Sequence, residues 1–263
     1  MRKTFVYMFV LASMAAMSSG CFMAGNYHSA KTLEPGVSSF GATFSVNAVY
    51  RDTEQQFAIP NIIPELTYHI GVVEDLELGG RLALGSLGIE MDAKYRFLKA
   101  GGLHLAVAPA VGYMGWVILQ GVSTRLPIVA TYEVTKWFGV SAAVFAGYSH
   151  YSVANDEYDD AVNDFSGDMI TYGVALGPEL SGETFFIRPT VEFTRYQVMV
   201  EAEGEDTGWN PINNLAFMVH FGWVYGREKQ QLDRIEKKVD DGFDRIERKL
   251  DEKQKEEEPE EDK

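Results

Sequence analysis

The sequence predicts an all-β fold: an antiparallel transmembrane β-barrel of about ten strands, within limits of eight and twelve, followed by a C-terminal α-helix. Three observations support this prediction. Apolar and polar residues alternate from Ser38 to Gly226, the polar face is rich in small residues and in charges of both signs, and aromatic residues gather near the ends of the apolar faces. Such a barrel fits within the 263 residues of the chain as one large β domain.

Period-two alternation marks strands whose two faces meet different surroundings. In the first run Phe40 and Phe44 share one face, whereas Gly41 and Thr43 share the other. Most runs have 10–14 residues, longer than the usual globular strand of about 5–6 residues and close to the ~9–11 residues of a tilted membrane-spanning strand. The predicted strands cover about 38–51, 62–73, 76–85, 87–98, 103–114, 121–134, 137–151, 169–180, 184–199 and 214–226.

Alternation alone leaves open which face points inward, because a soluble lipocalin-like barrel or a sandwich would bury the apolar face. Small residues on the polar face suit a narrow lumen, and charges of both signs can form pairs there. Aromatic rings with a polar tip favour the bilayer interface. The aromatic residues near strand ends are Tyr50, Tyr95, Tyr113, Tyr132, Phe138, Tyr148, Phe185, Trp223 and Tyr225. We therefore expect the apolar face to point toward lipid.

On that orientation, a set of charged and histidine side chains is expected to face the lumen. The set comprises Glu65, His69, Glu77, Arg81, Glu90, Asp92, Lys94, Arg96, Arg125, Glu133, Glu179, Arg188, Glu192 and His220. One interpretation is a network of ion pairs and hydrogen bonds that fills a narrow barrel, because buried charges need partners. The other is a selective polar path for a small solute or ion. Ten strands enclose little more space than the eight-stranded barrel that side chains fill, so a general pore is not expected.

The N-terminus reads as a secretory signal peptide. Arg2 and Lys3 precede an apolar stretch that is too short to act as a spanning helix, and small residues lead to Cys21. The Ser-Ser-Gly-Cys ending resembles the lipobox of bacterial lipoproteins, although Ser18 stands where Leu is common. In that family the cysteine becomes the first mature residue and carries acyl chains. Phe22, in place of the Asp that retains such proteins at the inner membrane, fits sorting to the outer membrane. The alternative is an ordinary signal peptide with an incidental cysteine.

The body, about 190 residues long, resembles the small outer-membrane β-barrels of Gram-negative bacteria in architecture, with no specific family signature. Such barrels have short periplasmic turns and longer outer loops. Connections at 73–76, 99–102, 135–136 and 181–183 are tight, whereas those at 52–61, 115–120, 153–168 and 200–213 are mostly longer; 85–87 is a short exception. An even strand count then places both termini in the periplasm, where an acylated Cys21 also belongs. The last strand does not end the chain, so Tyr225 substitutes for the usual terminal aromatic residue.

The composition changes abruptly after Gly226. Residues 227–263 contain 11 Lys and Arg and 15 Asp and Glu, and an 11-residue repeat, LDRIEKKVDDG followed by FDRIERKLDEK, with six identical positions. An 11-residue period gives about 3.67 residues per turn, which favours a straight or slightly right-handed helical association. The narrow apolar seam consists of Leu232, Ile235, Val239, Phe243, Ile246 and Leu250. The helix is read either as an oligomerisation or docking element or as a solvated spacer, because Gly242 weakens its middle by ~1 kcal/mol.

Few residues point to other chemistry. Ser149 and His150 end a strand beside an acidic loop, but adjacent strand residues face opposite sides and would not form a nucleophile–base pair, so an outer-rim hydrolase is only a minor alternative. The loop at 155–168 lacks the spacing of a calcium loop. No metal or cofactor is expected. The net charge of −15 makes the chain a poor nucleic-acid binder.

Taken together, we expect five segments: a signal peptide (1–20), a lipid-anchored linker (21–37), the transmembrane barrel (38–226), a helical segment (227–254) and a disordered acidic tail (255–263). The expected role is that of an outer-membrane lipoprotein with a largely plugged lumen, structural or adaptor in kind. Its expected partners are outer-membrane lipid and, through the C-terminal helix, a second copy or a periplasmic protein. A narrow channel is the alternative, and a surface enzyme is the third hypothesis.

Overall fold

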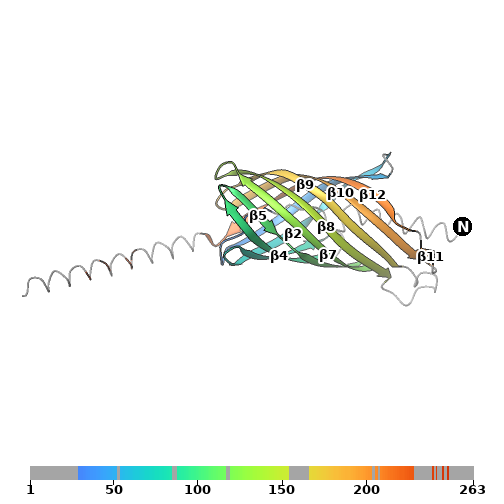
Figure 1. Ribbon diagram of the computed structural model, residues 1–263, viewed down its shortest axis with the longest axis horizontal. Coiled ribbons are helices and arrows are strands. Elements are labelled where there is room, and N and C mark those ends of the chain that lie inside the picture. The colour runs from blue at the N-terminus through green and yellow to red at the C-terminus, as the bar shows by residue number, and fades with distance from the viewer. Residues whose placement is uncertain are drawn as a thin grey trace, which may run out of the picture. The chain divides into compact units, whose positions relative to one another are not determined.

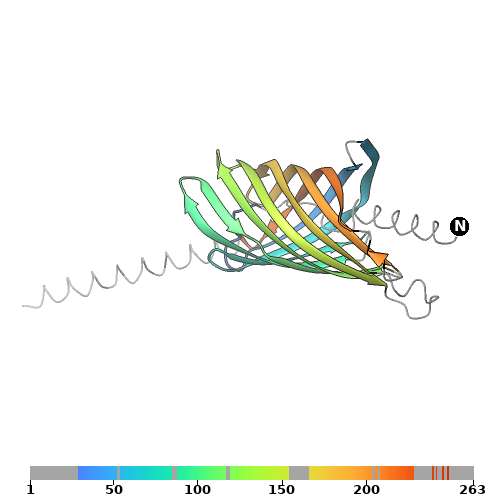
Figure 2. The same ribbon diagram turned by 45° about the vertical axis from the view of Figure 1, so that its right-hand side comes forward.

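The described part of the chain forms one antiparallel sheet that closes on itself as a barrel (Figures 1 and 2). The computed structural model describes residues 29–51, 54–84, 88–116, 119–153, 166–202, 205–206 and 208–227, and four single positions in the tail. The strands are β1 (Ser38–Arg51), β2 (Glu54–Val73), β3 (Leu76–Ala83), β4 (Gly88–Ala100), β5 (Leu103–Val107), β6 (Ala110–Trp116), β7 (Leu119–Glu133), β8 (Phe138–Val153), β9 (Ser166–Ser181), β10 (Phe185–Ala202), β11 (Glu205–Asp206) and β12 (Asn210–Tyr225).

Ten strands span the barrel in these residues, which confirms the predicted fold class. Two of the twelve segments do not count separately. β5 and β6 are the two halves of one spanning strand, since both pair with β4 and with β7, and β11 is a two-residue extension that pairs with β10. Each strand pairs with the next in the chain, and β12 pairs with β1 to close the barrel.

Prolines explain where the ladders are interrupted. The break between β5 and β6 falls at Ala108 and Pro109, opposite Pro127 of β7, and neither proline has an N–H to donate. The β9–β10 ladder has a similar gap between the pairs Ile187–Leu180 and Val191–Leu176, a stretch that contains Pro178 and Pro189. The interruptions shorten the ladders locally but leave the barrel closed.

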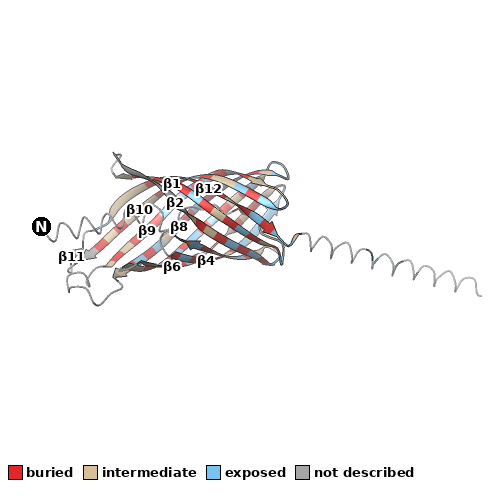
Figure 3. Ribbon diagram, turned by 180° about the vertical axis from the view of Figure 1, so that it is seen from behind, coloured by how far each residue is buried: buried red, intermediate tan, exposed pale blue. Residues whose placement is uncertain are grey.

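Burial alternates along the strands (Figure 3). The exposed residues of the wall are mostly apolar, and many of the buried ones are polar or charged. On β8 and β9, Val144 and Leu176 are 53% and 58% exposed, whereas the lumen-facing Ser149 and Thr171 are 0% and 2% exposed. A soluble barrel would show the opposite arrangement, because water disfavours a continuous apolar exterior. The lipocalin-like alternative is therefore wrong, and the exterior is that of a transmembrane barrel.

Exposed tyrosine and tryptophan side chains gather toward the two ends of the exterior, whereas exposed phenylalanines such as Phe44, Phe193 and Phe217 lie between them. Near the short turns lie Tyr68, Tyr95, Tyr132, Trp137, Phe185, Trp223 and Tyr225, and toward the opposite end lie Tyr113, Tyr148 and Tyr172. This arrangement matches the aromatic girdles that flank the apolar band of membrane barrels.

The turns at one end are tight, and their backbone geometry explains why. Ala100 pairs with Leu103, so Gly101 and Gly102 form a two-residue hairpin loop, and both have positive φ (56° and 87°). Positive φ at both central residues is what a type I′ hairpin turn requires, and glycine adopts it without strain.

One predicted loop is a strand instead. Residues 54–61, which the sequence pattern assigns to a long connection, begin β2 and pair with β1 from Arg51–Glu54 to Ser45–Asn61. Pro60 fits there because β3 pairs with β2 only from Glu65 onward, which leaves the other edge of this stretch unpaired. The two hairpin arms therefore extend beyond the rest of the wall.

The chain divides into two compact units, Met1–Val224 and Tyr225–Lys263. The predicted seam helix falls almost wholly outside the described residues; of the seam, only Val239 is described, and it is 48% exposed. A search of the described residues finds no helix with both the length and the apolar character to span a membrane.

The outward apolar face makes lysine at its centre costly. Leu176 pairs with Val191 of β10, near the middle of the outward apolar stretch, and is 58% exposed, so Leu176→Lys should destabilise the barrel in phospholipid vesicles by about 2–4 kcal/mol. The same substitution at Ile170, closer to the end of the strand, should cost about 0–1 kcal/mol. Urea unfolding of the two variants in vesicles measures the difference. Equal costs at both positions would contradict a lipid-facing exterior.

Candidate functional site

The candidate site is the lumen, where charged side chains from neighbouring strands form pairs. Arg81 Nη1 lies 3.2 Å from Glu65 Oε2, and Arg81 Nη2 lies 3.1 Å from Glu90 Oε2. Arg125 Nη2 donates to Glu90 Oε1 at 2.7 Å. None of the four side chains is more than 8% exposed, and their two positive and two negative charges balance. Buried charges of this kind are stable because each is neutralised by an opposite charge and makes hydrogen bonds to it.

The register of β3 against its neighbours sets these pairs. Arg81 stands directly across from Glu90, and Glu77 stands across from Lys94, whose Nζ lies 2.9 Å from Glu77 Oε1. Cross-strand partners on the same face lie close enough for opposite charges to bind. The alternating residues of one short strand therefore organise the charges of two adjacent strands.

A glycine in β3 allows a third pair to form across it. Gly79 lies between His69 of β2 and Asp92 of β4, and a Cβ at Gly79 would fall 1.8 Å from His69 Cδ2. The His69 ring occupies that space and its Nε2 lies 3.3 Å from Asp92 Oδ2. A larger residue at this position would displace the ring and break the contact.

Residues 29–37 belong to the stretch that the sequence pattern assigns to a linker, but its first residues are buried against the inner side of the barrel wall, whereas Glu34, Pro35 and Gly36 are exposed near the short turns. Ser29, Ala30 and Val37 are completely buried. The segment is held by its backbone: Ala30 N donates to Thr131 Oγ1 at 2.8 Å, and Leu33 N donates to Glu77 Oε2 at 2.9 Å. Val37 O accepts from Gly71 N at 2.9 Å, near the β2–β3 turn. We call residues 29–37 the plug segment.

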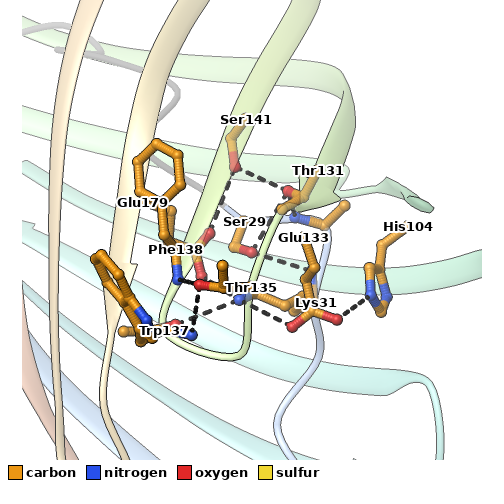
Figure 4. Close-up of polar contacts among 12 residues, drawn as sticks. Ser29, Lys31, His104, Thr131, Glu133, Thr135, Trp137, Phe138, Ser141 and Glu179 are labelled. Carbon is orange, nitrogen blue, oxygen red and sulfur yellow. Dashed lines mark hydrogen bonds and ion pairs between the residues drawn. The ribbon is translucent and has the colours of Figure 1, made fainter. Parts of the chain in front are cut away.

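Lys31 joins the plug segment to the wall through ion pairs (Figure 4). Its Nζ lies 2.8 Å from Glu179 Oε1, 3.5 Å from Glu133 Oε1 and 3.3 Å from Ser181 Oγ. Glu133 also contacts His104, with Nε2 and Oε2 3.1 Å apart. Because Glu179 is only 1% exposed, Lys31 supplies a large part of the charge compensation that this carboxylate needs.

Further charged side chains lie at the same end of the barrel, near the short turns. Arg188 Nε lies 3.6 Å from Glu179 Oε2, and the Arg188 guanidinium lies 4.4 Å from the centre of the Phe186 ring. Arg96 donates from Nε to Asp75 Oδ1 at 2.7 Å, in the β2–β3 turn. Residues near the short turns therefore close the mouth with mixed charges.

The remaining inward-facing groups are mainly neutral hydrogen-bonding side chains. Thr67 Oγ1 and His220 Nε2 lie 3.1 Å apart, and Asn214 Nδ2 donates to Asn47 Oδ1 at 3.1 Å. Glu192 accepts from Thr194 Oγ1 at 2.7 Å. A small cavity of about 30 Å³ lies beside the ion pairs, with Glu65, Arg81, Glu90, Met114 and Ser123 among its lining residues. That space is enough for a water molecule.

The structure places most of the predicted lumen residues inside the barrel. Eleven are 7% exposed or less: Glu65, His69, Glu77, Arg81, Glu90, Asp92, Lys94, Arg125, Glu179, Glu192 and His220. Arg96, Glu133 and Arg188 are partly exposed near the short turns. Two further lumen residues are not among those predicted. His104 could have been found, because alternation along β5 turns it inward. Lys31 could not, because it precedes the alternating strands and carries no periodic signal.

The described residues assemble neither a Ser–His pair nor a metal cluster at the rim. Ser149 is fully buried on the lumen side, whereas the His150 side chain is 46% exposed on the outside. His150 Nδ1 contacts Asp168 Oδ1 at 2.9 Å, and Tyr148 Oη donates to the same oxygen at 2.5 Å. Across the described ranges, no three His, Cys, Asp or Glu side chains are grouped as metal ligands would be. Cys21 and loop 155–165 lie outside the described residues.

Comparison with solved structures shows likeness of fold. The chain is 12% identical to Ail, the attachment invasion locus protein of Yersinia pestis, over 73% of this chain and 99% of that one, with a TM-score of 0.33. It is 9% identical to the outer membrane protease OmpT from Escherichia coli over 75% of this chain and 99% of that one, with a TM-score of 0.38. It is 12% identical to the COG4313 outer membrane channel from Pseudomonas putida F1 over 77% of this chain and 99% of that one, with a TM-score of 0.38. No family model and no curated protein matches the chain. At these identities the likeness concerns the fold alone.

Proposed function

We propose that the chain is an outer-membrane β-barrel lipoprotein of structural or adaptor role, with a lumen sealed by its own side chains. The observation that supports this proposal best is the plug segment, whose first residues lie inside the barrel and which is tied to the wall by Lys31. A polypeptide segment inside a narrow lumen leaves little room for a solute to pass.

The proposed orientation follows from the barrel's own ends. β1 begins and β12 ends beside the short turns, since the strands are antiparallel and even in number. Short turns face the periplasm in outer-membrane barrels, so both ends of the barrel domain would face it too. An acyl chain on Cys21 would then anchor the N-terminus to the outer membrane, and residues 227–254 would extend a helix toward a periplasmic partner or a second copy.

A narrow channel is the second candidate function. Hydroxyl oxygens of Thr43, Ser149 and Thr171 are buried in the described wall without a hydrogen-bond partner. Buried hydroxyl groups without partners are expected to bind water, and a chain of such waters would conduct small solutes. Under this alternative, the plug segment would be the gate.

Planar-bilayer recordings separate the two candidates. The plugged-barrel proposal predicts no steady single-channel steps from the full-length mature protein. Reproducible steps that disappear in Arg188→Ala or Glu192→Ala would instead support the channel and place its path along those residues.

The Lys31–Glu179 contact should stabilise the barrel measurably. Lys31→Met leaves the buried Glu179 with Arg188 as its remaining nearby cation and should cost about 2 kcal/mol in urea unfolding in vesicles. The control Lys136→Met alters an exposed turn lysine and should stay within about 0.5 kcal/mol. In a double-mutant cycle with Glu179→Gln, a coupling energy near zero would show that the plug segment is not held by this pair.

Truncation tests the adaptor role and a separate substitution tests the lipid anchor. Deleting residues 227–263 should abolish self-association and recovery of periplasmic partners in cross-linked pulldowns, while leaving barrel assembly in the outer membrane intact. Unchanged partner recovery would exclude the helix as the docking element.

Cys21→Ala should remove acyl labelling and lower the mass of the mature protein accordingly; an unchanged mass would exclude lipidation at Cys21.

A further inference from the structure

An arginine, Arg195, stands on the lipid-facing side of β10. Thr194 and Tyr196 on either side are 1% and 3% exposed and face the lumen, so Arg195 points outward in line with Val191 and Phe193. Its Nε is buried and has no hydrogen-bond partner in the described part of the chain. An unpaired guanidinium beside lipid is costly unless an anion or water satisfies it.

The surrounding wall supplies no negative charge to Arg195. Tyr172 of β9 and Asn213 of β12 stand directly across from it, and its outward neighbours on β10 are Phe193 and Gln197. The nearest outward carboxylate along β9, Asp168, is four residues beyond Tyr172 and already binds Tyr148 and His150. Among the described residues, the strands beside Arg195 therefore place no carboxylate next to its charge.

The height of Arg195 on the wall matches a lipid headgroup. Outward residues of β10 from Phe185 to Phe193 are apolar, and ten residues of tilted strand from Phe185 to Arg195 rise about 25 Å along the barrel axis. That rise equals the apolar band of a membrane barrel, about 25 Å tall. β12 shows the same boundary, since its outward residues are apolar from Tyr225 to Leu215 and polar at Asn213.

We propose that Arg195, with Asn213 and Gln197 beside it, binds the phosphate of a membrane lipid headgroup at the end of the barrel opposite the short turns. Arginine suits this role because its planar fork donates two parallel hydrogen bonds to phosphate oxygens. The side-chain amides add neutral donors; Gln197 Nε2 already donates to Tyr172 Oη at 3.4 Å, which holds it beside the arginine. Assignment of this lipid to the outer leaflet rests on the orientation in the proposed function, whereas the contact itself does not.

Native mass spectrometry of the full mature protein in detergent micelles tests the contact. The probes are dimyristoyl phosphatidic acid, dimyristoyl phosphatidylcholine and inorganic phosphate, each added to separate samples. We expect the wild-type barrel to retain phosphatidic acid in preference to both of the others. Arg195→Gln should weaken that retention about tenfold, as expected for loss of a charge-assisted hydrogen bond, and Arg195→Lys should restore part of it.

Two controls keep the test specific. Lys136→Gln removes an exposed cation at the opposite end of the barrel and should leave retention unchanged. Heat-modifiable gel mobility shows that each variant is folded. Retention that is equal in wild type and Arg195→Gln, equal for the two lipids, or matched by inorganic phosphate overturns the proposal. None of these outcomes bears on whether the lumen conducts, so the proposed function is tested separately.

Discussion

The requirement that lipid meet only apolar side chains determines the rest of this structure. Every second side chain of a spanning strand faces lipid, so the side chains between them must fill a narrow interior that is closed to bulk water. Polar and charged residues placed there need partners, and the register of β3 provides them by aligning Glu77 and Arg81 with Lys94 and Glu90. The ion pairs of the lumen are thus a consequence of the outward apolar face, in addition to any role of their own.

The same constraint explains why the N-terminal chain enters the barrel. Wall cations already lie near both buried carboxylates, with Lys94 beside Glu77 and Arg188 beside Glu179. The plug segment adds the Leu33 amide to Glu77 and the Lys31 ammonium to Glu179. Ala30 packs against Ala106, Val129, Ala143 and Ala175, where only small wall residues leave space for another chain. The choice of alanine at these wall positions and the path of the segment are therefore linked.

Sequence reasoning predicted the strands and their facing because both depend on a local, periodic signal. The alternation predicts the first strand with the bounds that the structure shows, 38–51, and the side chains of Arg81, Glu90 and Arg125 are buried in the structure. The plug segment was missed because residues 29–37 are positioned by contacts with Thr131 and Glu179, about 100 and 150 positions away along the chain, and no pattern in the segment itself records them. The hairpin extension at 54–61 lies outside the predicted strands because three polar residues, 54–56, are followed by three apolar residues, 57–59, which breaks the period-two alternation.

Spin-label accessibility on adjacent residues of β9 tests the central claim most directly. Nitroxides attached at Val174, Ala175 and Leu176, in a background with Cys21 replaced, report which side chains meet the bilayer. If the apolar face points toward lipid, oxygen dissolved in the bilayer should relax the labels at Val174 and Leu176 strongly and the label at Ala175 little. High oxygen accessibility at Ala175 with protected labels at its two neighbours would contradict the outward apolar face, and with it the interpretation of the lumen.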